Sequence, residues 1–232
     1  MKGVTISWFT TLFIFVVFAL GLLLFFGGKA FRKEHRRGYD VLTDFPFEMT
    51  CGEGNSYRMA KILSFVFAGF DALSAAYLLI LEPIHPQLLS FSILYLVLVV
   101  GKDVAFCFLA NVPAYNFRPH ILSFTFYSAL TVLSLTVSSL LFFNGLSASF
   151  GLALTFMIIL AVLALGGLAF LFNPKLSQWT KLDAVAEQDG SITTSRPRSF
   201  PLAATEWLFV LLSSLGTLLT LIGFFVLSLT QL

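Results

Sequence analysis

Three ionisable residues lie inside long apolar runs of this sequence: Asp71 in one run, and Lys102 and Asp103 in another. A charge at the middle of a bilayer costs about 3 kcal/mol or more unless it is paired or hydrated. At a rise of about 1.5 Å per residue, Asp71 lies about 16 Å and Lys102 about 12 Å from the same end of two antiparallel helices. Because a lysine side chain can span that difference, we predict an ion pair between Asp71 and Lys102.

Asp103 projects about 100° away from Lys102 around their helix, so it is expected to need another partner. Lys61, at the edge of the run that holds Asp71, is one candidate. Two interpretations of these four residues stay open. They form a pathway for protons or ions, or a polar substrate pocket. Alternatively, they form a structural network that fixes how the helices pack.

Other polar residues flank the apolar runs. Glu206 begins the last run, where a carboxylate complements the dipole of a helix start or contacts a gate or substrate. Glu48 and Cys51 belong to an acidic, aromatic stretch that also contains glycine. We expect that stretch to fold over one mouth of the helix bundle or to contact a partner.

Small and hydroxyl-bearing side chains recur in the last three apolar runs, and their spacing of three or four residues favours tight helix packing. The three histidines (His35, His85 and His120) are scattered over loops and helix ends, which gives no metal or haem spacing. No phosphate-binding loop, nucleophile elbow or paired-cysteine motif occurs. We therefore predict no cofactor and no metal, and the chain is not assigned to an enzyme class.

Composition indicates a membrane protein. Of 232 residues, 58% are hydrophobic and only 11% are charged, so one soluble core could not bury the apolar surface. A net charge of +2 provides no basic field for nucleic acid. Apolar runs of about 20 residues predict six spanning helices in an all-α bundle. They cover roughly 5–27, 60–81, 88–110, 120–143, 147–172 and 203–230. Every proline falls outside these runs, as helix interiors require.

Basic residues predict the orientation, because loops on the inner side are enriched in Lys and Arg. The connections 28–59 and 173–202 carry most of these residues, and the second and fourth connections carry none. We therefore expect both ends of the chain outside, with most of the polar mass inside. The segment 28–37, which contains Arg36 and Arg37, is expected to contact anionic lipid head groups.

One stretch resembles a known family. The segment 47–52 (Phe-Glu-Met-Thr-Cys-Gly), followed by Arg58, Lys61 and Phe70-Asp71, is similar to the small core subunit 3 of respiratory complex I. The resemblance covers about residues 1–84. It implies that Cys51 marks a loop near a quinone channel and that Asp71 lies on a polar axis of the membrane arm. Leu73 stands where that family has a second acid, and that family has three spans.

These observations favour a non-enzymatic integral membrane protein. It is a subunit embedded in a larger assembly, or a small transporter of protons, ions or a solute that uses buried charges. A divergent complex I subunit, in which case the mitochondrial inner membrane would be its location, and a lipid-modifying enzyme are the alternatives. The expected partners are the lipid bilayer and other membrane subunits, with no nucleic acid.

Overall fold

Six long α-helices form the body of the molecule. The computed structural model describes residues 2–80, 89–113, 117–144, 149–172, 183–186, 192–195 and 201–230. The helices are α1 (Lys2–His35), α2 (Asn55–Ile80), α3 (Leu89–Leu109), α4 (Phe117–Asn144), α5 (Phe150–Leu171) and α6 (Pro201–Thr230). Each is long and apolar enough to cross a membrane, which confirms the predicted bundle and fits a multi-pass integral membrane protein.

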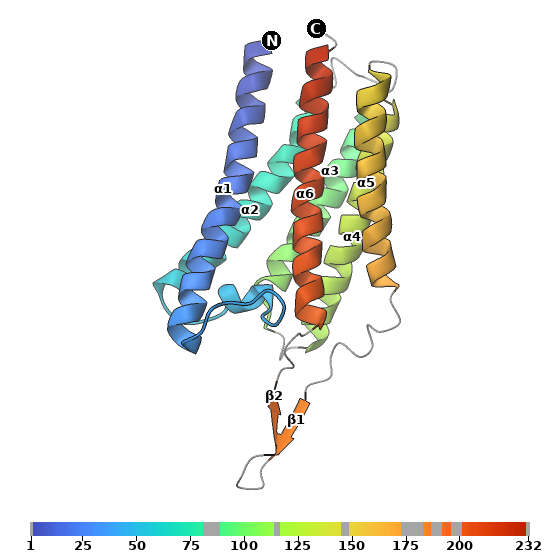
Figure 1. Ribbon diagram of the computed structural model, residues 1–232. Helices are drawn as coiled ribbons and strands as arrows, with labels where there is room; N and C mark the ends of the chain where they lie inside the picture. The colour runs from blue at the N-terminus through green and yellow to red at the C-terminus, as the bar shows by residue number, and fades with distance from the viewer. Residues whose placement is uncertain are drawn as a thin grey trace.

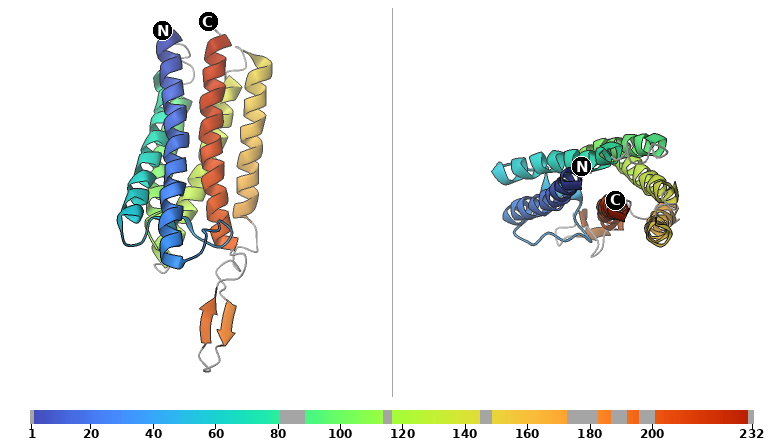
Figure 2. Two further views of the ribbon diagram at one scale, coloured as in Figure 1. Left: turned by 60° about the vertical axis from the view of Figure 1, so that its left-hand side comes forward. Right: turned by 90° about the horizontal axis from the view of Figure 1, so that it is seen from above.

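The last helix occupies the middle of the bundle. Seen along the bundle axis, α6 lies on the concave side of an arc formed by the other helices (Figure 2). Consecutive helices pack against one another along the arc, and α6 contacts α1, α2, α4 and α5. Because α4 and α6 are separated by one intervening span, they run in the same direction (Figure 1). This parallel pair positions most of the polar side chains described below.

The two ends of the bundle differ. The start of α1 and the end of α6 lie at one end, and the connection between α1 and α2 lies at the other (Figure 1). Lys29 and Arg32 belong to the last turns of α1 and Arg37 follows that helix, so these cations lie at the second end, where the inner side is expected. The absolute orientation stays a prediction from the distribution of charge.

Several helix boundaries differ from the sequence prediction. α1 continues to His35 instead of ending near residue 27, because backbone hydrogen bonds extend a helix beyond the hydrocarbon layer. Pro119 and Pro201 lie in the first turns of α4 and α6 instead of outside the helices. A first turn tolerates proline because its amide would have no partner within the helix.

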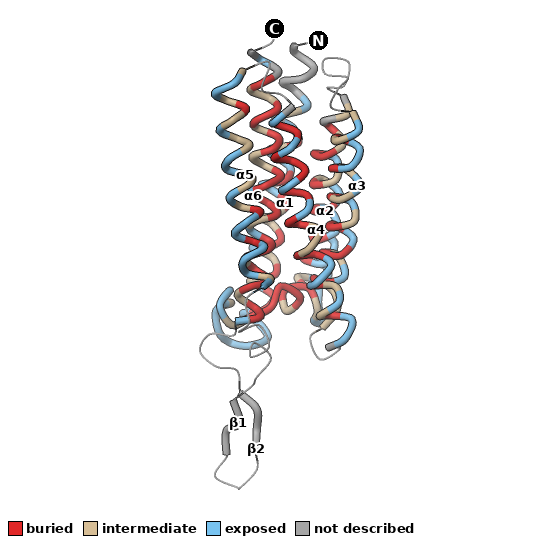
Figure 3. Tube along the Cα trace, turned by 90° about the vertical axis from the view of Figure 1, so that its right-hand side faces the viewer, coloured by how far each residue is buried: buried red, intermediate tan, exposed pale blue. Residues whose placement is uncertain are grey.

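The connection 36–54, which we call the loop cap, folds back onto the bundle. It contains a short 3-10 helix, η1 (Pro46–Met49), in which Glu48 accepts a hydrogen bond from the Phe45 amide at 2.8 Å. Phe45, Phe47 and Met49 are buried, and η1 contacts α1, α2 and α6. Buried residues run through this segment and along the inward faces of the helices (Figure 3). The expected folding of this stretch over one mouth of the bundle is therefore observed.

A small hairpin interrupts the stretch 173–202, which the sequence analysis treats as a loop. Strands β1 (Asp183–Ala186) and β2 (Ile192–Ser195) pair antiparallel, with Asp183 opposite Ser195. Threonine, valine and isoleucine in these strands favour the extended conformation. The hairpin projects away from the helices (Figure 1), so the candidate site is built from the bundle and the loop cap.

Candidate functional site

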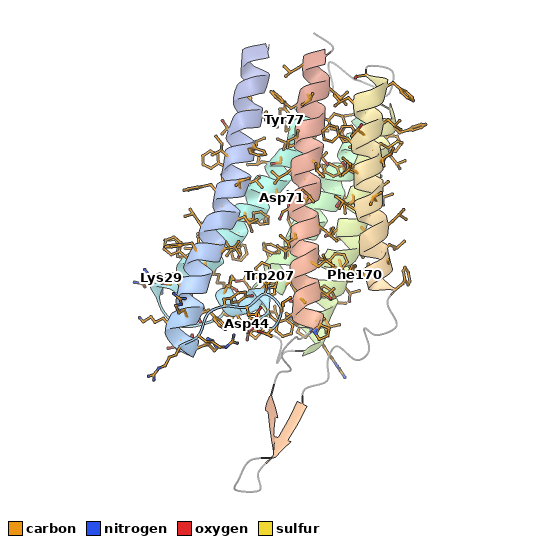
Figure 4. All side chains as sticks on the ribbon, viewed as in Figure 1. Lys29, Asp44, Asp71, Tyr77, Phe170 and Trp207 are labelled. Carbon is orange, nitrogen blue, oxygen red and sulfur yellow. The ribbon has the colours of Figure 1, made fainter. Side chains whose placement is uncertain are left out.

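A buried ion pair joins α2 and α3. Lys102 Nζ lies 2.6 Å from Asp71 Oδ2, and both side chains are 1% exposed. Asp71 lies near mid-height of the bundle (Figure 4), where an unpaired charge would be most costly. The predicted pairing of Asp71 with Lys102 is confirmed.

The expected partner of Asp103 is wrong. Lys102 Nζ also lies 3.9 Å from Asp103 Oδ1, whereas Lys61 is exposed and forms no ion pair with Asp103 in the described chain. The flexible lysine side chain carries its ammonium far from its own backbone, so the angle between neighbouring residues does not limit its reach. We call Asp71, Lys102 and Asp103 the buried triad.

The buried triad holds two carboxyl groups and one ammonium. Asp71 Oδ1 and Asp103 Oδ2 are buried and have no hydrogen-bond partner among the described residues. The two carboxyl groups also interact with each other. If both were ionised, the triad would carry a net negative charge away from water, which is unfavourable without further hydrogen bonds. A proton on one carboxyl would remove that excess charge.

Two buried tyrosines connect the triad to α6. Tyr95 and Tyr127 both interact electrostatically with Lys102. Tyr127 interacts with Ser213, and Tyr95 interacts with Thr217 and Thr220. Since Tyr95 and Lys102 are seven residues apart, they share one face of α3. Hydroxyl groups therefore extend from the triad along α6.

A second buried pair joins the starts of α4 and α6. His120 Nε2 lies 2.8 Å from Glu206 Oε1, and the two side chains are 1% and 0% exposed. His120 Nδ1 lies 2.8 Å from the Val112 carbonyl, which can only accept, so Nδ1 carries a hydrogen. The bond to Glu206 then holds one proton, carried either by the imidazole or by the carboxyl.

Sequence reasoning missed this pair. It found no metal or haem spacing for His120 and left Glu206 open between the helix dipole and a gate or substrate contact, because each residue was considered on its own helix. The available signal was that a histidine and an acid both fall within the first two turns of two parallel helices. Only the packing of α4 against α6 shows that these turns lie at the same depth.

Two pairs of residues that are 86 positions apart in the sequence lie side by side on the parallel helices α4 and α6. They are His120 with Glu206 and Tyr127 with Ser213. Farther along, Ser138 and Thr220 form a hydroxyl bond of 2.5 Å. We call these three pairs the polar seam. Near its far end, Tyr95, Ser134 and Thr217 help to enclose a space of about 160 Å³ that is too narrow for a water molecule.

An apolar layer divides the polar seam. Between Glu206 and Ser213, a distance of about 10 Å along the helix, lie buried Phe209 and Val210. The ring of Phe124 meets Phe209 edge to face, with centroids 5.9 Å apart. The seam is therefore interrupted by apolar side chains in this structure.

Hydrogen bonds hold the loop cap against the end of the bundle that contains the His120–Glu206 pair. Arg37 donates two hydrogen bonds, of 2.8 and 2.5 Å, to the buried Asp44 carboxylate, and this contact raises the pKa of Arg37. The Trp207 indole donates to the Asp44 carbonyl and to the Tyr39 hydroxyl (Figure 4 shows Asp44 and Trp207 at the lower end of the bundle). Burial raises the pKa of Tyr39 well above its ordinary value.

The loop cap also contacts other helices. The Thr50 hydroxyl donates to the Ala110 carbonyl at the end of α3. Phe45 and Phe47 present their faces or edges to the His120 ring, at centroid distances of 5.6 and 5.3 Å. The loop cap therefore covers the His120–Glu206 pair with aromatic side chains.

The remaining candidate residues have local roles. Glu48 caps η1, and Arg36 is exposed. Cys51 is half-buried, and burial raises its pKa, which keeps the thiol protonated and is unfavourable for a nucleophile. No group of three or more metal-ligating side chains occurs within the described ranges.

Comparisons with known proteins identify no relative. No family model, curated protein or solved structure matches the chain. The resemblance to subunit 3 of respiratory complex I stays a prediction, and the function must be argued from the geometry.

Proposed function

We propose that this protein transfers protons within the membrane, as a small proton-coupled transporter or as a proton-translocating subunit of a larger assembly. The observation that carries the proposal is the buried triad. Two carboxyl groups share one ammonium, and one oxygen of each carboxyl lacks a partner in the described chain. Such a cluster can take up and release a proton with little change in structure.

The polar seam supports the same function. Tyrosine, serine and threonine hydroxyls can both donate and accept a hydrogen bond, which a proton relay requires. His120 and Glu206 provide a second proton-binding pair nearer the loop cap. The space beside Tyr95 near the far end of the seam is too narrow for a water molecule, which favours a proton over a larger solute as the cargo.

Proton transfer would need water to enter between the two centres. Phe124 and Phe209 close the seam on the triad side, and Phe45 and Phe47 cover the His120–Glu206 pair. Movement of these rings would admit water to one centre at a time. Such gating is what a transporter needs to avoid a continuous leak.

Proton flux into liposomes tests the proposal. Purified protein is reconstituted, a potassium diffusion potential is applied, and the internal pH is followed with a trapped dye. We expect flux above that of protein-free liposomes and at least a tenfold loss in Asp71→Asn. Asp40→Asn, which removes an exposed carboxylate of the loop cap, is the matched control. Equal flux in the wild type and Asp71→Asn would refute the role of the triad.

A structural role in a larger assembly is the second candidate, and the apolar layer that interrupts the seam favours it. Under that alternative, the charges only fix helix packing. The double variant Asp71→Asn/Lys102→Met would then retain every activity of the wild type. Native gels in mild detergent would show the chain migrating with partner subunits.

A further inference from the structure

An apolar groove of about 370 Å³ lies on the outer surface of the bundle, between α3 and α4. Gly101 and Ala105 form its floor on α3, and the largely exposed side chains of Phe108, Leu122 and Phe126 form its walls. None of its lining residues belongs to the buried triad, the polar seam or the loop cap. What the groove binds is therefore a question separate from proton transfer.

The groove exists because small side chains on α3 leave space that α4 does not fill. Gly101 and Ala105 are four residues apart, so they share one face of the helix. A Cβ at Gly101 would meet only the Leu130 side chain of α4, at 3.4 Å. The volume of the groove is far above the roughly 30 Å³ that one water molecule occupies, so a chain of methylene groups has room in it.

The lining of the groove requires an apolar occupant. Ser123 is the one hydroxyl-bearing residue among the described residues that line it, and its Oγ donates to the Pro119 carbonyl at 2.8 Å. The groove lies between the candidate spans Leu89–Leu109 and Arg118–Phe143, where lipid hydrocarbon surrounds a membrane protein. No polar group of the groove is left to hold a polar ligand, and burying one there would be costly.

A cation marks one end of the groove. Arg118 immediately precedes Pro119, which lines the groove near the start of α4. The Arg118 side chain is exposed and forms no ion pair within the part of the chain that the structure describes. Because Arg118 begins its candidate span, it lies at the depth of lipid head groups. A guanidinium binds phosphate oxygens through two parallel N–H groups.

The combination of groove and cation selects the ligand. A soluble anion would leave the apolar groove unused, and a partner helix, about 10 Å across with its side chains, could cover the groove but not enter it. No lining residue is a carboxylate, so an ammonium on the head group would find no counter-charge there. We propose that the groove binds one acyl chain of an anionic phospholipid, whose phosphate contacts Arg118.

Lipid retention by the full-length protein tests this site. Protein in mild detergent is titrated with phosphatidylglycerol or phosphatidylcholine of identical chains, and bound lipid is counted by native mass spectrometry. We expect at least fivefold higher retention of phosphatidylglycerol, because its head group carries no ammonium to offset the phosphate. Equal retention of the two lipids would overturn the proposal. A protein dimer that excludes lipid would assign the groove to a second copy of the chain and overturn it as well.

Two variants fill the groove from opposite helices. Gly101→Leu and Ser123→Leu each place a branched side chain in it, and each is expected to reduce phosphatidylglycerol retention at least threefold. Gly166→Leu is the matched control, because a Cβ at Gly166 on α5 meets nothing within 4 Å and Gly166 does not line the groove. Thermal unfolding identifies the variants that fold, and either groove variant suffices. Unchanged retention in a folded groove variant, or an equal loss in Gly166→Leu, refutes binding in the groove.

The contact with Arg118 is tested through the preference between the two lipids. Arg118→Gln should abolish the preference and leave phosphatidylcholine retention unchanged, because the acyl chain still occupies the groove. Arg58→Gln is the matched control, since Arg58 is an exposed arginine in the first turn of α2 that does not line the groove. An unchanged preference in Arg118→Gln, or the same loss in Arg58→Gln, would show that the preference does not depend on this contact and would overturn it.

Discussion

His120 Nε2 on α4 lies 2.8 Å from Glu206 Oε1 on α6, and both side chains are buried away from solvent. Because the Val112 carbonyl fixes the hydrogen on His120 Nδ1, the proton between His120 and Glu206 stays within the pair whichever residue holds it. The pair can therefore be neutral overall at this depth, and it differs in this respect from the buried triad.

Two substitutions of Glu206 should separate the contribution of this pair to protein stability from its contribution to proton transfer. Glu206→Ala leaves a buried imidazole nitrogen without a partner, which we expect to destabilise the protein by about 2 kcal/mol. Glu206→Gln keeps a hydrogen bond to His120 but cannot exchange a proton. We expect Glu206→Gln to unfold near the wild-type temperature and to lose most proton flux. Thermal unfolding and liposome flux check this, and wild-type flux in Glu206→Gln would remove the pair from the pathway.

Replacing Lys102 alone should destabilise the protein more than replacing Lys102 and Asp71 together. Lys102→Met leaves Asp71 and Asp103 buried without a counter-charge, and we expect a destabilisation of about 3–5 kcal/mol. The double variant Asp71→Asn/Lys102→Met should recover most of that loss. Chemical denaturation in detergent of the wild type, Asp71→Asn, Lys102→Met and the double variant measures the coupling between the two positions. Additive effects would show that the 2.6 Å contact contributes no interaction energy.

Close packing of α4 on α6 should depend on Gly216. A Cβ at Gly216 would overlap Leu135 at 2.3 Å, whereas one at Gly166 on α5 would meet nothing within 4 Å. We expect Gly216→Ala to cost about 1–3 kcal/mol through overpacking. Gly166→Ala is the matched control and should be neutral or stabilising. Leu135→Ala should partly rescue Gly216→Ala in thermal unfolding, and the absence of rescue would argue against this contact.

Stability of the loop cap should fall at alkaline pH. The ordinary pKa of tyrosine is about 10, and burial raises that of Tyr39 in the folded protein. The stabilising effect is therefore complete below about pH 10 and is lost as pH rises above it, because only the unfolded chain then releases the proton. Tyr39→Phe should flatten the decline in unfolding temperature above pH 10. An identical decline in that variant would exclude Tyr39 as its origin.

Two neighbouring arginines should differ in their effect on the loop cap. Arg37 binds Asp44 through two hydrogen bonds, whereas Arg36 is exposed. Because the Arg37 side chain is 48% exposed, solvent weakens the pair, and we expect Arg37→Gln to cost only about 1 kcal/mol. Limited proteolysis of residues 36–54 should accelerate in Arg37→Gln and not in Arg36→Gln. Equal acceleration in both variants would indicate a general effect of charge.

The bundle could be predicted from the sequence because the hydrocarbon core of a bilayer requires long apolar helices. Charged residues within such helices are therefore easily recognised in the sequence. Asp71 and Lys102 were paired by depth alone, since both helices have nearly fixed rise per residue. The partner of Asp103 could not be found this way, because the position of a lysine ammonium depends on rotamers and packing. The His120–Glu206 pair depends on the register between two helices that are not consecutive, which no local pattern specifies.

The loop cap shows the same limit in another form. Its composition indicates a structured segment, but the burial of Asp44 cannot be predicted from the sequence, because a charged loop residue is usually exposed. Its burial depends on Arg37 from the same loop and on Trp207, which is 163 residues away in the chain. The groove beside Gly101 likewise arises only when α3 and α4 are packed together.

The bond between Asp44 and Trp207 has a consequence for biosynthesis. Spans emerge from the ribosome in order, and the first connection is made long before the sixth helix. The carbonyl of Asp44 can meet its indole donor only after α6 has entered the bilayer. The earliest loop of the nascent chain is thus completed by the final segment, and a chain arrested before α6 would leave residues 36–54 open to proteases.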